Sequence, residues 1–74
     1  MVKTAIRFYL KRYGHDFRVM REDLGLTQFE VAKKLLCSQA IISHIEMGYY
    51  LPSPAFEQEL LDLYNAKGGL NDED

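Results

Sequence analysis

Residues 25–48 read GLTQFEVAKKLLCSQAIISHIEMG, and the spacing of their apolar side chains indicates the architecture of the chain. These apolar positions recur at helical intervals in two groups. They are Val31, Ala32, Leu35, Cys37, Ile42 and Ile45. The pattern suits two short helices that pack at a steep angle across a tight turn, with the small side chain of Ala32 where the helices come closest.

Residues that begin or end helices divide this stretch at the same place. Thr27 is a favourable N-cap and Glu30 stands at the capping-box position, so we expect a helix over about Gln28–Leu35. Ser38 is expected to cap a second helix over about Gln39–Met47, which the following glycine ends. Two helices joined in this way form a helix-turn-helix, whose second helix commonly lies in the major groove of DNA.

The flanking sequence predicts two further helices. One runs from about His15 to Leu24 and ends at Gly25. The other begins where Ser53 supplies an N-cap and Pro54 follows in the first turn. This last helix presents a set of apolar side chains to the core or to a partner, and Gly68 and Gly69 are expected to end it. The set comprises Phe56, Leu60, Leu61, Leu63 and Tyr64.

Residues 2–12 fit two patterns. Ile6, Phe8 and Leu10 alternate with charged or aromatic residues, which favours an extended arm or short strand ending near Gly14. A helical spacing also passes through the segment and continues beyond it, at Ile6, Leu10, Tyr13, Phe17, Met20 and Leu24. We expect the arm or strand, for which a second copy of the chain would supply a partner. The expected organisation is a basic arm (1–13), a helix-turn-helix domain (14–67) and an acidic flexible tail (68–74).

Charge is unevenly distributed along the 74 residues, whose net charge is −2. Residues 1–21 hold six of the nine Lys and Arg residues, whereas residues 22–74 hold ten of the eleven acidic ones. Proteins that bind nucleic acid usually present a basic surface, so the overall charge argues against that function and the basic end argues for it.

Several classes of protein are not expected. The single cysteine, Cys37, excludes an internal disulfide and a cysteine-based metal cluster, and a reducing cytoplasm suits it. His15 and His44 have no metal-ligand spacing, and no glycine-rich phosphate loop is present, so we expect neither an enzyme nor a cofactor. No apolar run approaches the roughly 18 residues that span a bilayer, and charges within the first dozen residues argue against a signal peptide.

A family resemblance rests on residues 21–28 (REDLGLTQ), the Val31-Ala32 pair, residues 42–48 (ISHIEMG) and Pro52. These motifs resemble the Cro/C1-type helix-turn-helix family, which includes phage repressors and Xre-like bacterial regulators. The resemblance extends from about Phe17 to Leu63. It implies an all-α, lambda-repressor-like fold of four or five helices and a sequence-specific transcriptional regulator, most often a repressor, that binds double-stranded DNA as a homodimer.

The resemblance also implies roles for individual residues. Arg21 and Glu46 occupy the positions of a partly buried ion pair, and Gln28 that of a phosphate contact. Gln39 is the best candidate base reader, because its amide matches adenine N6 and N7. The full set of expected DNA-binding residues is Thr27, Gln28, Ser38, Gln39, Ala40, Ser43, His44, Tyr49 and Tyr50.

Three departures from the pattern of this family weaken the expected binding to DNA. Leu36 stands where the family often has Gly, and a bulky residue there resists positive φ, which predicts a different turn. Tyr49 and Tyr50 replace the usual Lys or Arg, and the recognition helix itself carries neither. The basic arm, with Lys3, Arg7, Lys11 and Arg12, would then have to reach the duplex.

These departures leave a second function open. Around the end of the recognition helix, Ile41, Tyr49, Tyr50 and Leu51 form an apolar group typical of protein interfaces. The chain would then be a modulator that binds a partner protein and contacts DNA weakly alone. Such a modulator could be an antirepressor or co-repressor that binds a repressor, or an antitoxin whose acidic half neutralises a basic toxin.

Overall fold

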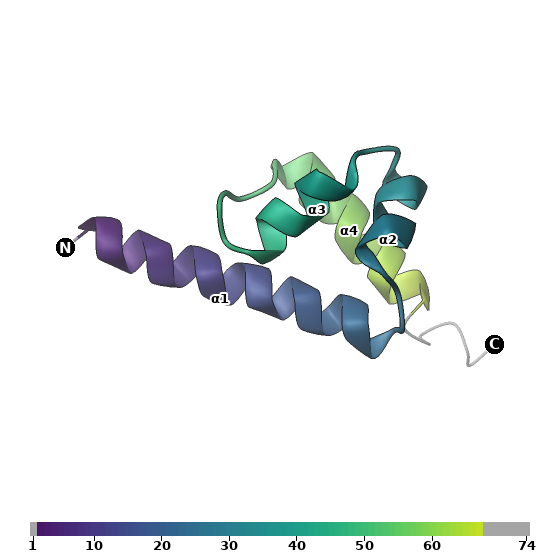
Figure 1. Ribbon diagram of the computed structural model, residues 1–74, viewed down its shortest axis with the longest axis horizontal. Coiled ribbons are helices and arrows are strands. Elements are labelled where there is room, and N and C mark those ends of the chain that lie inside the picture. Colours follow the sequence, from purple (N-terminus) through teal and green to yellow (C-terminus); the bar gives the residue numbers. More distant parts are fainter. Residues whose placement is uncertain (1, 68–74) are drawn as a thin grey trace.

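The computed structural model describes the backbone of residues 2–67 and the side chains of residues 6–66. Within this range four helices follow one another: α1 (Val2–Asp23), α2 (Gln28–Leu35), α3 (Gln39–Glu46) and α4 (Pro54–Lys67). Helices α2, α3 and α4 gather over the C-terminal half of α1, while its N-terminal half extends beyond them (Figure 1). The all-α class predicted from the sequence is confirmed.

Residues 2–12 form the first turns of α1, so the predicted arm or strand was wrong. The segment instead follows the alternative helical spacing, since Tyr13 packs against the core and Phe17 is buried in it. A helix satisfies its own backbone N–H and C=O groups, whereas a lone strand leaves them unpaired. The predicted domain boundary after residue 13 therefore falls inside a continuous helix, and the predicted tail (68–74) lies outside the described residues.

Most of the predicted helix ends are confirmed. The capping box is present, since Thr27 Oγ1 accepts from the Glu30 N–H at 3.0 Å and Glu30 Oε1 accepts from the Thr27 N–H at 2.8 Å. Ser53 Oγ accepts from the Phe56 N–H at 3.1 Å in the first turn of α4. Gly25, with φ +73°, ends α1 in the left-handed conformation that glycine adopts without a Cβ penalty.

All four helices contribute to the core. Its buried side chains are Phe17 of α1, Val31 and Ala32 of α2, Ile42 and Ile45 of α3, and Leu60 and Tyr64 of α4. Apart from Tyr64, the larger of these side chains each stabilise the fold by about 1.5–3 kcal/mol when fully buried. Ala32, the small residue predicted to lie where α2 and α3 come closest, is 2% exposed.

The turn between α2 and α3 contains one residue in the left-handed conformation, although that residue is not glycine. Leu36 has φ 58° and ψ 44°, and the N–H of Cys37 donates to the Ala32 carbonyl at 3.0 Å across the turn. The expectation of a different turn was therefore wrong. A residue with a Cβ pays about 1–2 kcal/mol for this conformation. The side chain of Leu36 is 93% exposed, so burial does little to offset that cost.

At Gly14 the backbone of α1 lies directly against the last turn of α3. A Cβ placed there would lie 2.6 Å from the carbonyl oxygen of Glu46 and closer still to that of Ile45. No larger residue fits without movement of one helix. Gly14 therefore lies in the middle of a helix and sets the separation of α1 and α3, so the prediction that it ends an arm was wrong.

Candidate functional site

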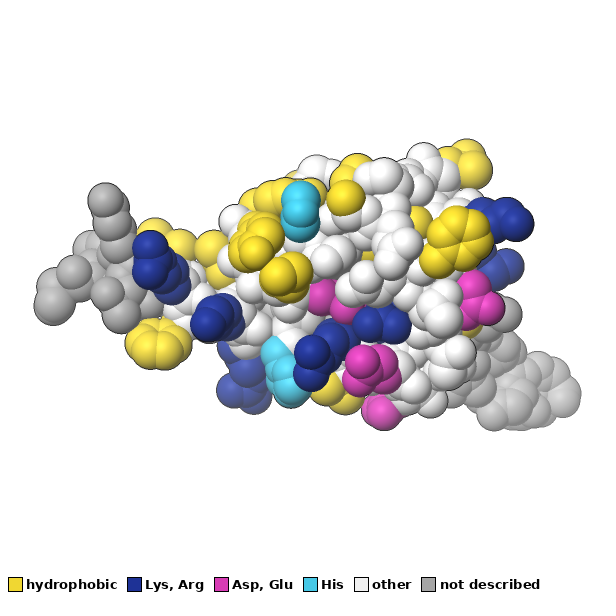
Figure 2. All heavy atoms as spheres, in the orientation of Figure 1, with side chains coloured by type: hydrophobic (Ala, Val, Ile, Leu, Met, Phe, Trp, Pro, Cys, Tyr) yellow, Lys and Arg dark blue, Asp and Glu magenta, His cyan; other side chains and the backbone are white. Residues whose placement is uncertain are grey.

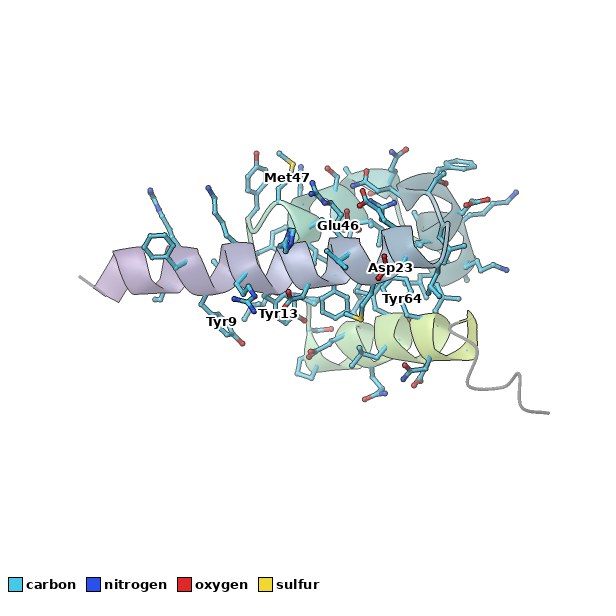
Figure 3. All side chains as sticks on the ribbon, turned by 90° about the horizontal axis from the view of Figure 1, so that it is seen from below. Tyr9, Tyr13, Asp23, Glu46, Met47 and Tyr64 are labelled. Carbon is cyan, nitrogen blue, oxygen red and sulfur yellow. The ribbon has the colours of Figure 1, made fainter. Side chains whose placement is uncertain are left out.

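The outward side of α3 consists of side chains at helical intervals. Ala40, His44 and Met47 are exposed and Ser43 is half-buried. Met47 points away from α1 and α4 (Figure 3), and its sulfur lies 3.5 Å from the hydroxyl oxygen of Ser43. Ala40, Ser43 and His44 were predicted from the sequence, whereas Met47 was not. Its spacing of seven residues from Ala40, or two helical turns, was the signal that could have identified it.

A chain of polar contacts connects α3 to α2. Gln39 Nε2 donates to Gln28 Oε1 at 3.3 Å, and Gln28 Nε2 donates to Glu46 Oε1 at 3.0 Å. An ionised carboxylate only accepts hydrogen bonds, so Glu46 fixes the orientation of the Gln28 amide, and that amide in turn fixes Gln39. Gln39 retains its carbonyl oxygen and one N–H for a ligand. The predicted phosphate contact and the predicted base reader thus lie side by side.

The predicted ion pair between Arg21 and Glu46 anchors this chain of contacts. Arg21 Nε donates to Glu46 Oε2 at 2.7 Å and Nη2 donates to Oε1 at 2.9 Å, which makes the pair bidentate. Arg21 Nη1 also donates to the Leu26 carbonyl at 2.7 Å. Both charged side chains are buried, and the hydrogen bonds to Glu46 raise the pKa of the Arg21 guanidinium above its ordinary value. The pair holds the end of α3 to α1.

Thr27 and Ser38 are the N-cap residues of α2 and α3, but only the Thr27 hydroxyl caps its helix. The Thr27 hydroxyl and N–H are both engaged in the capping box with Glu30. An anion at this helix start would therefore meet the N–H groups of Gln28 and Phe29, which lie in the first turn. Ser38 occupies the N-cap position of α3, but its hydroxyl accepts no cap hydrogen bond, contrary to expectation.

Three aromatic rings gather where α3 ends. The centroid of His44 lies 5.2 Å from that of Tyr49 and 6.2 Å from that of Tyr50. Gly48 lies between helix and loop with φ +82°, and the Tyr49 N–H donates to the His44 carbonyl at 3.0 Å. The three predicted residues are thus brought together, with Tyr49 59% exposed.

A helix-turn-helix domain model matches residues 12–73, which is most of the chain. The chain belongs to this family. No curated protein and no solved structure matches it. In a helix-turn-helix, the second helix carries the residues that contact base edges, and here that helix is α3.

The described part of this helix-turn-helix domain offers no sign of a metal site or a membrane span. No group of three or more His, Cys, Asp or Glu residues among the described residues could hold a metal ion. Likewise, none of the described helices combines the length and apolar character needed to cross a bilayer.

An apolar hollow of about 450 Å³ lies beside the helix-turn-helix. Ile41, Tyr50 and Leu51, three of the residues predicted to form an apolar surface, line it together with Phe56. Tyr49, the fourth, borders a different hollow on the α1 side. Burial raises the pKa of the Cys37 thiol, also in the lining, which keeps it in its less reactive protonated form.

Positive charge borders the exposed side of α3. Figure 2 shows Lys and Arg side chains along α1 on the same face of the molecule as α3. No Lys or Arg occurs in residues 35–66, so α3 and the loop that follows it contribute none. Cations for a phosphate backbone near the end of α3 must therefore come from other elements of the helix-turn-helix domain.

Proposed function

We propose that this protein is a sequence-specific transcriptional regulator of the Cro/C1 or Xre-like type that acts as a repressor by placing α3 in the major groove. Gln39 reads a base there, with Ala40, Ser43, His44 and Met47 facing the groove. Gln28 and the first turn of α2 bind a phosphate. Occupation of a promoter would block polymerase.

The observation that carries this proposal is the orientation of Gln39 by Gln28 and Glu46. Base reading needs a side chain whose donor and acceptor are presented in a fixed order. The Gln28 contact at 3.3 Å leaves the exposed Gln39 amide one carbonyl oxygen and one N–H for a ligand, the pair that complements adenine N6 and N7. An exposed glutamine without such a neighbour would lose more side-chain entropy on binding.

We further propose that the protein binds DNA as a homodimer. Two copies related by a two-fold axis would read two half-sites separated by about one helical turn, roughly 34 Å. The small size of the domain supports this proposal, because a single recognition helix contacts few base pairs.

Direct binding to DNA tests the proposal. The purified protein is titrated with duplex DNA from beside its own gene and with a random duplex of equal length, at two salt concentrations. We expect selective binding that weakens steeply with salt, since phosphate contacts release counterions. Equal, weak binding to both duplexes would contradict sequence-specific recognition by the protein alone.

The apolar hollow favours a second candidate, a modulator that binds a partner repressor or toxin. Ile41, Tyr50 and Leu51 line this hollow at the side of the helix-turn-helix, and Tyr50 and Leu51 are 41% and 44% exposed. Under this function the protein alone would bind neither duplex selectively, and Leu51→Glu would abolish partner binding. Selective DNA binding that survives Leu51→Glu would favour the first candidate.

A further inference from the structure

The basic residues of α1 lie on a defined side of that helix. Arg7 and Lys11 are four residues apart and Arg18 follows seven residues later, spacings that place all three on one stripe. Arg12 is adjacent to Lys11 in sequence but is rotated from it by about 100° around the helix axis. This stripe exists only because residues 2–12 are helical.

The N-terminal part of the stripe borders the end of α3. A Cβ on Gly48 would lie 3.0 Å from both Cα and N of Lys11, so the two backbones are in contact. Arg7 and Lys11 line a hollow of about 530 Å³ together with Met47 and Tyr49. Long side chains with nitrogen ends extend from the N-terminal half of α1 toward the side on which Met47 lies (Figure 3).

The positive charges of Arg7 and Lys11 are not paired with acidic side chains among the described residues. Arg12 pairs with Asp16 at 3.4 Å and Arg18 with Glu22 at 3.9 Å. No described carboxylate forms a salt bridge with Arg7 or Lys11. Residues 35–66 contain no Lys or Arg, and among the described side chains Arg7 and Lys11 are cations that the fold places beside the exit of α3.

We propose that Arg7 and Lys11 form a phosphodiester-binding surface on α1 that contacts the DNA backbone flanking the groove entered by α3. The surface supplies from α1 the cations that the loop after Gly48 lacks. This inference rests on the proposed DNA-binding function and adds the residues that hold the backbone.

The experiment compares variants in equilibrium binding to the protein's own upstream duplex and to a random duplex over a series of salt concentrations. Arg7→Gln and Lys11→Gln each remove one positive charge from the surface. Arg12→Gln is the matched control, because it removes the same charge from the neighbouring position on another side of α1. Arg7→Lys tests for rescue, and circular dichroism melting verifies that each variant is folded.

We expect Arg7→Gln and Lys11→Gln each to reduce the slope of log K against log salt by about one, equally on both duplexes, because a phosphate contact carries no sequence information. Arg12→Gln should leave the slope unchanged and Arg7→Lys should restore it. If the slope falls equally in all three Gln variants, the cause is net charge and the proposal is overturned. The proposal is also overturned if the slope falls in none of them. Absence of wild-type binding to either duplex would overturn the proposed function as well.

Discussion

Gln39 Nε2 lies 3.3 Å from Gln28 Oε1, and Gln28 Nε2 lies 3.0 Å from Glu46 Oε1. The proposed base reader is therefore two hydrogen bonds from the ion pair that joins α3 to α1. Fold stability and the proposed base recognition therefore depend on the same carboxylate, that of Glu46. A change at Glu46 is expected to affect both, and a change at Gln39 only the second.

Gln39→Ala should relax discrimination at one base pair by about 1–3 kcal/mol, because it removes the bidentate amide. Gln28→Ala should relax the same position, since Gln39 would lose its orienting partner. Competition titrations against operators substituted one base pair at a time measure both effects. The loss of discrimination in the double variant should be smaller than the sum of the losses in the two single variants. An unchanged base preference in Gln39→Ala would show that Gln39 does not read a base.

Glu46→Gln should destabilise the fold by about 3 kcal/mol, because it leaves the buried guanidinium of Arg21 without its counter-charge. Urea unfolding measures the loss. The double variant Arg21→Met/Glu46→Leu is the control. It removes both charges, so its loss should be smaller than the sum of the losses from the two corresponding single substitutions. If the loss in the double variant equals the sum of the two single losses, Arg21 and Glu46 do not stabilise each other.

Gly14→Ala should destabilise the protein by about 1–3 kcal/mol through overpacking, since the new methyl group would collide with the carbonyl oxygens of Ile45 and Glu46. On helix propensity alone the same substitution would stabilise α1 by about 1 kcal/mol. The sign of the change in unfolding free energy therefore distinguishes the two effects. A stabilised variant would mean that α1 and α3 do not approach so closely.

Leu36→Gly should stabilise the protein by about 1 kcal/mol, because glycine adopts the left-handed conformation without the Cβ clash. The gain is reduced by the greater freedom of glycine in the unfolded chain. Leu36→Ala keeps the Cβ while removing the exposed side chain, so thermal unfolding of this control should resemble that of the wild type. Equal stabilisation by both substitutions would indicate that the exposed leucine, and not backbone strain, is responsible.

Stability should fall as the pH rises from about 10 to 12. Burial raises the pKa of Tyr64 to about 12 from an ordinary value of 10.0. Between these values the unfolded chain releases the phenolic proton that the folded chain retains, so unfolding is favoured by at most about 2–3 kcal/mol. Burial and a hydrogen bond with Glu57 raise the pKa of Tyr13 in the same direction. Denaturant titrations of the wild type and of Tyr64→Phe should diverge in this range; parallel pH profiles would contradict the assignment.

The helix-turn-helix was predictable because its signals are local. The Thr27 capping box and the apolar spacing of Val31, Ile42 and Ile45 each act within a few residues, and the structure contains all of them. The end of α2 at Leu35 was predicted correctly, but the left-handed conformation of Leu36 was not, because a bulky side chain disfavours positive φ.

Two further errors concern contacts between segments far apart in the sequence. Residues 2–12 satisfy both strand and helix patterns, and the choice depends on whether the helix can continue through Gly14. Nothing near Gly14 in the sequence indicates that the carbonyls of Ile45 and Glu46 need that space. The same long-range contact brings Arg7 and Lys11 to the end of α3, so their position could not follow from local patterns.

The N-terminal half of α1 extends beyond the body of the protein, and Ile6, Phe8 and Tyr9 within it are 52%, 70% and 58% exposed. The turns that precede Leu10 and Lys11 depend mainly on their own hydrogen bonds, and helical turns without tertiary packing are marginal in water. If Arg7 and Lys11 bind phosphates, association would also complete the folding of this segment. Affinity for DNA would then vary with helix propensity at positions that never contact the duplex, and binding would be accompanied by a gain in ellipticity.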